Sequence, residues 1–121
     1  MTVQDELVSI KVAKLAYKKR FDEECLALYQ TILIEGEQNH NYINEKGIYS
    51  APTQSHLQRW LRDIHNIYPI VNVNISQDDK MKFNITVYDM NVLEQKTYSY
   101  YLSYENALEI GLYKALKLIE I

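Results

Sequence analysis

The chain has few residues that cross-link a fold or interrupt helices and strands: its 121 residues include one cysteine, three glycines and two prolines. The single cysteine, Cys25, excludes an internal disulfide and is typical of a reducing cytoplasm. The glycines are isolated and none precedes a lysine. This excludes a Walker A loop and a dinucleotide fingerprint, because both cluster glycines so that backbone amides can approach a phosphate.

Long apolar runs and a basic excess are also missing. No apolar stretch approaches the roughly 20 residues that cross a bilayer, and Met1–Glu6 has neither the basic nor the apolar region of a secretory signal. We therefore expect a cytoplasmic protein without a membrane partner. The 13 basic and 16 acidic residues give a net charge of −3, which argues against nucleic acid, because proteins that bind phosphates usually carry a basic excess.

The composition that is present, 47% hydrophobic and 24% charged, is ordinary for a globular protein. No stretch rich in Pro, Gly or Ser suggests a linker, so residues 1–121 are expected to form a single domain.

Two segments in the first half of the chain have apolar residues at helical spacing. Residues 8–20 follow a Ser9 cap and carry two apolar stripes, so this helix is either sandwiched in the core or half-covered by a partner. A second helix begins at Pro52-Thr53. It is expected to end at Pro69, because the residue before a proline is disfavoured in the α region.

A third helix is predicted from a Ser103 cap to about Ile119. Gly111 lies inside it, and because glycine weakens a helix, its presence suggests that another backbone approaches closely there. The predicted buried stripe comprises Tyr104, Leu108, Leu112, Ala115 and Ile119.

The remaining segments predict strands and one long loop. Residues 25–34 are apolar on both faces and are interpreted as a buried strand, with a short helix opened by Asp22-Glu23-Glu24 as the alternative. Residues 35–50 form a polar loop longer than usual, which is typical of functional or disordered segments. Three alternating segments predict an antiparallel meander with one apolar and one polar face; they are residues 71–75, 81–87 and 98–102.

The expected fold class is α+β: an antiparallel meander of three to four strands with helices packed on one face, in the order α-β-loop-α-β-β-β-α. Residues 53–119 share the element order of double-stranded-RNA-binding domains. Their last helix begins with Glu105 and Glu109 instead of the basic cluster that such a domain needs, so the match is limited to topology.

Candidates for catalysis and metal binding are few. His56 and His65 are nine residues apart and point to opposite sides of a helix, so they are not placed to share a metal. Cys25 with His40 or His56 would make a nucleophile–base pair if the fold brought them together, but a lone cysteine in an apolar stretch is usually inert packing. We expect no catalytic residue, no metal and no cofactor, and keep a Cys25 hydrolase as a third hypothesis.

The polar face of the meander is the leading candidate for function. Such a face is either simply hydrated or contacts a protein, since interfaces are enriched in tyrosine. On the outer face of the second helix, Arg59 and Arg62 with Ser55 and Gln58 are candidates for phosphate contact. The candidate interaction surface comprises Asn72, Asn74, Asn84, Thr86, Ser99, Tyr101, Arg59 and Arg62.

Helix caps and core stripes in three stretches carry a further likeness. The stretches are Val12–Ala16 with Phe21-Asp22-Glu23, Ala51-Pro52-Thr53-Gln54 with Trp60-Leu61-Arg62 and His65-Asn66-Ile67, and Ser103–Glu109 with Gly111-Leu112 and Ala115–Ile119. Together they resemble a group of small uncharacterised proteins carried by bacterial prophages and other mobile elements. The resemblance implies kinship and a similar fold but no activity. Such relatives often have Gly where this chain has Arg20, and Gly is the residue that a left-handed helix C-cap prefers.

Two functional hypotheses lead. The first is a non-enzymatic cytoplasmic interaction module of mobile-element origin that binds protein, including a second copy of itself as a homodimer. The alternative is a nucleic-acid-binding accessory protein that uses the polar sheet face together with Arg59 and Arg62.

Overall fold

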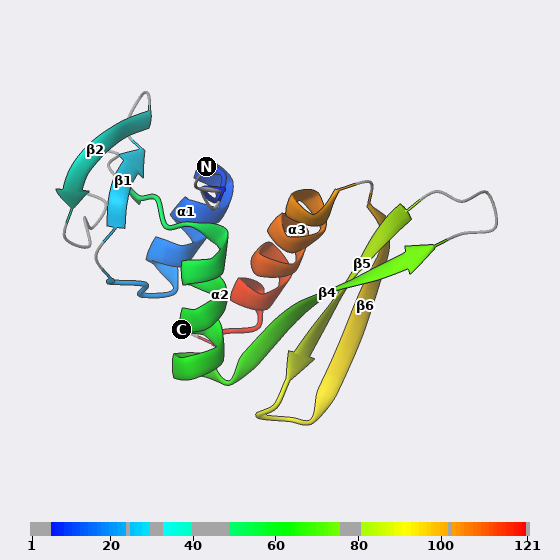
Figure 1. Ribbon diagram of the computed structural model, residues 1–121. Coiled ribbons are helices and arrows are strands. Elements are labelled where there is room, and N and C mark those ends of the chain that lie inside the picture. The colour runs from blue at the N-terminus through cyan, green and yellow to red at the C-terminus, as the bar shows by residue number, and fades with distance from the viewer. Residues whose placement is uncertain are drawn as a thin grey trace.

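The computed structural model describes residues 6–23, 25–29, 33–39, 49–75, 81–101 and 103–120. It confirms the α+β class and the antiparallel meander, and it adds a small sheet ahead of the second helix (Figure 1). The elements are α1 (Ile10–Lys18), β1 (Cys25–Tyr29), β2 (Leu33–Asn39), β3 (Tyr49–Ser50), α2 (Gln54–His65), β4 (Ile67–Ile75), β5 (Met81–Asp89), β6 (Glu94–Tyr101) and α3 (Tyr104–Lys117).

The helices lie on one face of the three-stranded sheet β4-β5-β6, as expected (Figure 1). Helix α3 packs across β4 and β5, α2 packs against α3 and β4, and α1 packs against α3. Their apolar stripes meet in one core, in which Trp60, Leu61, Ile85 and Leu112 are all buried. The uncovered face of the sheet is on the side opposite the helices.

The caps predicted at Ser9 and Ser103 are confirmed, and Thr53, at the predicted start of the second helix, is the cap of α2. The hydroxyl oxygens of Ser9, Thr53 and Ser103 each accept a hydrogen bond from the backbone N–H three residues later, at 3.3, 3.2 and 3.1 Å. Each bond satisfies an amide at a helix N-terminus that has no partner within the helix. Helix α1 ends where Arg20 adopts a left-handed backbone with φ of +68°.

The predicted end of α2 at Pro69 is wrong. The helix ends at Asn66, which adopts a left-handed conformation with φ of +58° and donates its backbone N–H to the Leu61 carbonyl. Asparagine tolerates this region because its short polar side chain bonds locally. Pro69 instead lies within β4, which is an edge strand, and edge strands accept proline because one row of their N–H groups bonds no neighbour.

The predicted strand after α1 is confirmed over β1, but it is shorter than expected. β2 pairs antiparallel with β1, with Ala27 opposite Glu35, so one strand does not continue to residue 34, and the helical alternative is wrong. The expected loop over 35–50 begins inside β2 and ends in β3, which pairs with β1; its residues 40–48 lie outside the described part. β2 is an edge strand of this sheet, and an edge tolerates its polar residues.

Helix α3 approaches the sheet closely at Gly111, but the neighbour is a side chain and not the expected backbone. A Cβ added there would overlap Ile85 Cγ1 and lie 2.7 Å from Ile85 Cδ1. The predicted stripe is confirmed at Leu108, Leu112, Ala115 and Ile119. It is wrong at Tyr104, which is 45% exposed because α3 begins near the rim of the sheet.

Candidate interaction surfaces

The uncovered sheet face gathers four of the predicted residues. Asn72 on β4 pairs with Asn84 on β5, and Ile70 pairs with Thr86, so Asn72, Asn74, Asn84 and Thr86 share this face. Thr86 is nonetheless buried, and its hydroxyl lies 2.9 Å from that of Thr97 on β6. Ser99 is exposed and lies in the irregular part of β6.

The placement of Tyr101 on this polar face is wrong. Phe83 pairs with Tyr101 and Ile85 pairs with Tyr98, so β6 uses one more residue than β5 over this interval. Such a bulge shifts the alternation of faces along the strand. Tyr101 therefore packs with Phe83 against the core on the helix-covered side.

One end of the uncovered face is less polar than the sequence pattern predicts. Tyr68, Ile70, Tyr88 and Met90 line a shallow hollow of about 400 Å³ next to Asn66. The sequence prediction includes Tyr68 in the second helix and begins the next strand at residue 71, because it ends that helix at Pro69. The sequence signal for an earlier strand start is Asn66, because asparagine is a common left-handed C-cap and here ends α2 in that conformation.

A second surface, which sequence reasoning missed, lies on the helix side of the β4–β5 hairpin. Val73, Ile75 and Met81 alternate with the polar residues and so point to the same side as Ile85, yet they are 53, 75 and 56% exposed. Phe83 and Tyr104, whose ring centroids are 6.3 Å apart, close the surface toward the core. We name this set the arm surface; it comprises Val73, Ile75, Met81, Phe83 and Tyr104.

The arm surface is exposed because the hairpin reaches beyond the helical layer (Figure 1). α3 has 14 residues and β4 has nine. At the usual rise per residue they measure about 21 Å and about 30 Å, so a helix that crosses the sheet leaves strand ends uncovered. Alternation in the sequence predicts which side a residue faces, but not whether a helix reaches it.

The edge of the sheet at β4 lacks the usual protection against pairing. Its nine residues pair with β5 without a bulge, and its sequence IYPIVNVNI has no charged residue. The other edge, β6, has the bulge and carries Glu94 and Lys96. Charges, prolines and bulges are how natural proteins block strand addition, so β6 is protected and the outer part of β4 is not.

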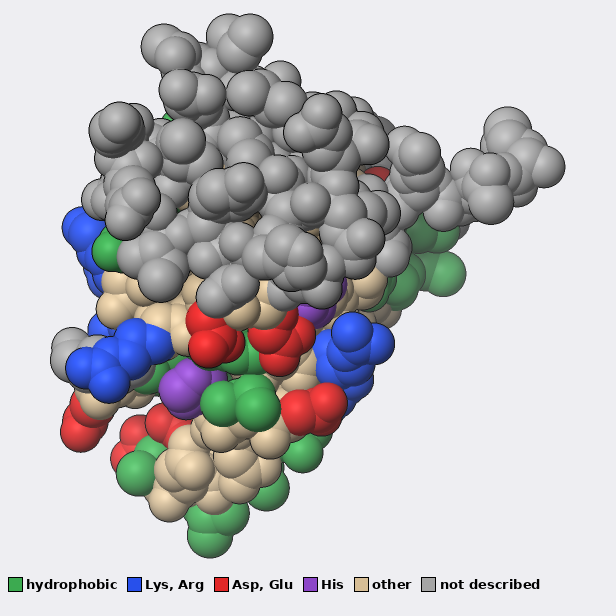
Figure 2. Space-filling model, turned by 90° about the vertical axis from the view of Figure 1, so that its left-hand side faces the viewer, with side chains coloured by type: hydrophobic (Ala, Val, Ile, Leu, Met, Phe, Trp, Pro, Cys, Tyr) green, Lys and Arg blue, Asp and Glu red, His purple; other side chains and the backbone are tan. Residues whose placement is uncertain are grey.

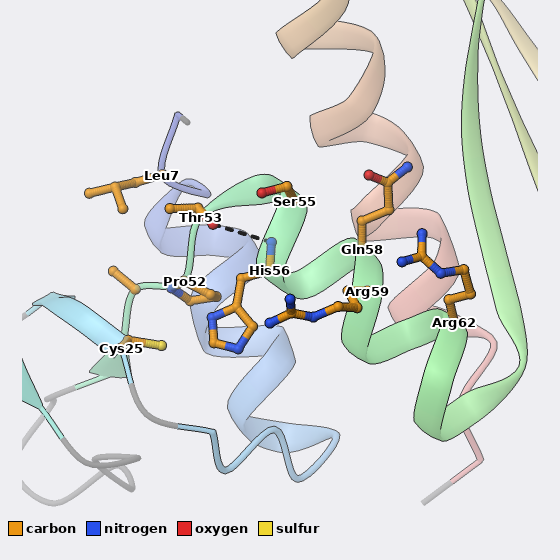
Figure 3. A pocket seen from close by; sticks show the side chains of 10 residues that line it. Leu7, Cys25, Pro52, Thr53, Ser55, His56, Gln58, Arg59 and Arg62 are labelled. Atoms are coloured by element: carbon orange, nitrogen blue, oxygen red, sulfur yellow. Dashed lines mark hydrogen bonds between the residues drawn. The ribbon is translucent and has the colours of Figure 1, made fainter. Parts of the chain in front are cut away.

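A third candidate is a cavity of about 530 Å³ beside the first turns of α2 (Figure 3). The predicted grouping on α2 is confirmed here, since Ser55, Gln58, Arg59 and Arg62 all line it. Arg59 extends toward His56 in Figure 3, and Arg62 lies beside Gln58. No carboxylate is among the described lining residues. Arg62 Nε lies 3.8 Å from Asp63 Oδ1, and both side chains are exposed.

The arginines and the polar sheet face do not form one surface. α2 belongs to the layer on the covered side of the sheet, so Arg59 and Arg62 are separated from Asn72 and Asn84 by that layer. Figure 2 shows the cations of the described residues on this side in separate groups, with acidic side chains between them. The described residues on this side therefore form no continuous basic tract of the kind that follows a nucleic-acid backbone.

Cys25 and His56 line the same cavity, and His40 lies outside the described residues. His56 Nε2 lies 2.7 Å from Glu23 Oε1, so a carboxylate orients the imidazole. The Cys25 thiol is 4% exposed and donates to the Glu23 carbonyl oxygen at 3.5 Å. A buried thiol bonded to a backbone oxygen has the surroundings of a packed cysteine, because reactive thiols are partly exposed and electropositive.

His65, at the end of α2, is partly buried. Its ring packs edge-on against Trp60, with centroids 4.6 Å apart. Burial disfavours the charged imidazolium and lowers the pKa of His65 below its usual value.

Within the described ranges, no three His, Cys, Asp or Glu side chains converge in an arrangement that could hold a metal. Among the helices described, none combines the length and the apolar character needed to traverse a bilayer. The chain matches no protein-family model, no curated protein and no solved structure.

Proposed function

We propose that this chain is a non-enzymatic protein-interaction module that binds a protein along the outer part of β4 and the adjoining arm surface. The observation that carries the proposal is the exposure of Val73 and Ile75 on the unprotected edge strand β4, with the exposed Met81 beside them on β5. A partner that covered these side chains would remove apolar area from water, worth about 25 cal/mol per Å².

The form of recognition that fits this surface is strand addition. An added strand takes its affinity from main-chain hydrogen bonds along the edge and its specificity from alternate side chains. Beyond Pro69, no described residue bonds the outward main-chain groups of β4, and the same residues carry an aliphatic row on the helix side, so both requirements are met. A cytoplasmic location and a mobile-element origin belong to the proposal; the single cysteine and the resemblance described above support them.

A photoreactive amino acid at position 75 tests the proposal in cells that express the gene. The matched control is position 92, because Val92 is 58% exposed but lies in the turn between β5 and β6. We expect covalent adducts with a protein from position 75 and few from position 92, with the cross-linked residue mapped by mass spectrometry. Equal yields at the two positions would contradict the proposal.

A second candidate is phosphate binding at the α2 cavity, as a nucleic-acid accessory protein would need. Two arginines that line one cavity, with no carboxylate among the described lining residues, favour it. Retention of short RNA or DNA at about 50 mM salt that weakens steeply at higher salt is the expected result. The double variant Arg59→Gln/Arg62→Gln should abolish retention and Arg20→Gln should not. No retention by the wild type would end this candidate.

A further inference from the structure

We infer that the partner along β4 is a second copy of this chain, which pairs β4 with β4 antiparallel so that Val73 lies opposite Val73 at a two-fold axis. This inference rests on the proposed function and specifies its partner and register. It follows from three features of β4: which backbone groups are free, which register uses them, and which side chains then meet.

The backbone groups of β4 that bond no other described residue belong to its odd-numbered positions from Val71 to Ile75. The Asn66 carbonyl accepts from the Met90 N–H at 3.1 Å, so position 66 faces β5. The N–H and C=O of one residue point to the same side of an antiparallel strand, and successive residues alternate. Pro69 therefore faces outward, which agrees with its missing N–H and with the bond of 2.6 Å from Gln58 Nε2 to its carbonyl. Val71, Val73 and Ile75 face outward by the same alternation.

One register uses all of these groups. If Val73 pairs with the second copy's Val73, then Val71 pairs with the second copy's Ile75, and three outward-facing positions on each strand are matched. A register centred on Val71 would place Pro69 opposite Val73, where the proline has no N–H to donate and its carbonyl is already bonded to Gln58. The helical layer also lies at that end, since α2 packs on β4 there.

The side chains that meet in this register are mutually compatible. On the helix side the contacts are between valines at the axis and between Val71 and Ile75 flanking it, which are favourable β-branched cross-strand pairs. On the uncovered face Asn72 lies opposite the second copy's Asn74, and two amides bond to each other in either direction.

The lack of charge on β4, together with its self-complementary register, favours a second copy as the occupant. A strand that carries a net charge repels itself, whereas IYPIVNVNI is neutral and repels nothing. An isologous contact requires that one surface complement itself, and a neutral strand with aliphatic residues on one side and amides on the other meets this requirement. In the resulting six-stranded sheet, the exposed Ile75 of each copy would lie beside Val71 of the other copy, in the part of β4 that is closer to α2.

Disulfide trapping tests the register directly. At the two-fold axis, the cysteine of a Val73→Cys variant would lie opposite the same cysteine of the second copy. A hydrogen-bonded antiparallel pair has Cα atoms about 5.5 Å apart, within the range that a disulfide spans. We expect Val73→Cys to form covalent dimers on mild oxidation. Val71→Cys and Ile75→Cys should form few when oxidised separately and many when mixed. Wild-type protein, whose Cys25 is buried, gives the background.

A proline substitution separates dimer loss from unfolding. Val73→Pro removes an outward N–H in each copy and leaves the β4–β5 bonds intact. We therefore expect light scattering to show that the dissociation constant of the dimer rises about ten- to a hundredfold. The thermal transition of the monomer should remain cooperative. Asn72→Pro, by contrast, removes a bond to β5 and should destabilise the fold.

The outcomes distinguish the two proposals. The inferred β4–β4 dimer is overturned if the protein is a strict monomer at high micromolar concentration. It is also overturned if Val71→Cys alone forms covalent dimers and Val73→Cys does not. If such a monomer still gives adducts from position 75 with another protein, the proposed function stands without the inference. If neither dimer nor adduct forms, both fail.

Discussion

Gly111 of α3 lies directly against the side chain of Ile85 at the centre of β5, with no side chain of its own between the helix and the sheet. Both residues are buried. A methyl group at position 111 would overlap Ile85 Cγ1 and force either the helix or the strand to shift.

Gly111→Ala is therefore expected to destabilise the protein, although alanine is the better helix former. Overpacking of this kind costs about 1–3 kcal/mol, more than the roughly 0.5–1 kcal/mol that alanine gains in a helix. Urea denaturation monitored by Trp60 fluorescence measures the loss. In an Ile85→Ala background the same substitution should cost much less, because alanine lacks both the Cγ1 and the Cδ1 atoms that the added group would meet. An equal cost in the two backgrounds would contradict this explanation.

Arg20→Gly is expected to stabilise the protein by about 0.5–1 kcal/mol. Arg20 has φ of +68°, a conformation that glycine adopts without steric cost and other L-residues do not. The side chain is exposed, so little packing is lost. Lys18→Gly, inside the last turn of α1, is the matched control and should destabilise by about 1 kcal/mol. The two substitutions should shift the midpoint of thermal unfolding in opposite directions; a lower midpoint for both would contradict the prediction.

The stability of the fold should fall as pH is lowered through the range below about 6.5. Burial lowers the pKa of His65 in the folded state, so the unfolded state binds the proton more readily and protonation favours unfolding. The contribution is fully present above the unfolded pKa and is lost as pH falls toward the folded one. His65→Phe keeps the ring contact with Trp60 and removes the titrating group. Its thermal midpoint should depend less on pH between 8 and 5.5 than that of the wild type; equal slopes would rule out His65 as the cause.

Ile75→Lys should abolish association through β4 while leaving the monomer stable. Ile75 is 75% exposed, so its replacement removes little core packing and the free energy of unfolding should change by about 0.5 kcal/mol or less. A lysine at an edge is a common natural block to strand pairing, and two copies would bring like charges into the same contact. Val92→Lys, at a similarly exposed site in the β5–β6 turn, should leave association unchanged. Sedimentation at several concentrations compares them.

Local signals in the sequence are enough to place all three helix starts and most of the core. The helix starts at Ser9, Thr53 and Ser103 and the burial of Trp60 and Leu112 depend on residues within a few turns, and the structure confirms them. The errors depend on tertiary context. Pro69 is tolerated because β4 is an edge, and the polar β2 because it is an edge as well, and neither position in a sheet is visible in the sequence.

The candidate site shows the same division. Alternation correctly groups Asn72 and Asn74 with Asn84 and Thr86, because β4 and β5 pair in an unbroken register. It fails at Tyr101, where one extra residue in β6 reverses the faces. It gives no indication of the arm surface, because exposure of Val73 and Ile75 is set by how far α3 reaches across the hairpin.

The bond from Gln58 to the Pro69 carbonyl has a consequence for the size of any assembly. It occupies the inner end of the β4 rim, while the bulge and charges of β6 close the far rim. A chain that extends this sheet can pair only with the outer part of β4. Once a second copy has paired there, the combined sheet ends on both sides in a protected β6. Growth then stops at a closed pair instead of continuing into a ribbon or fibre.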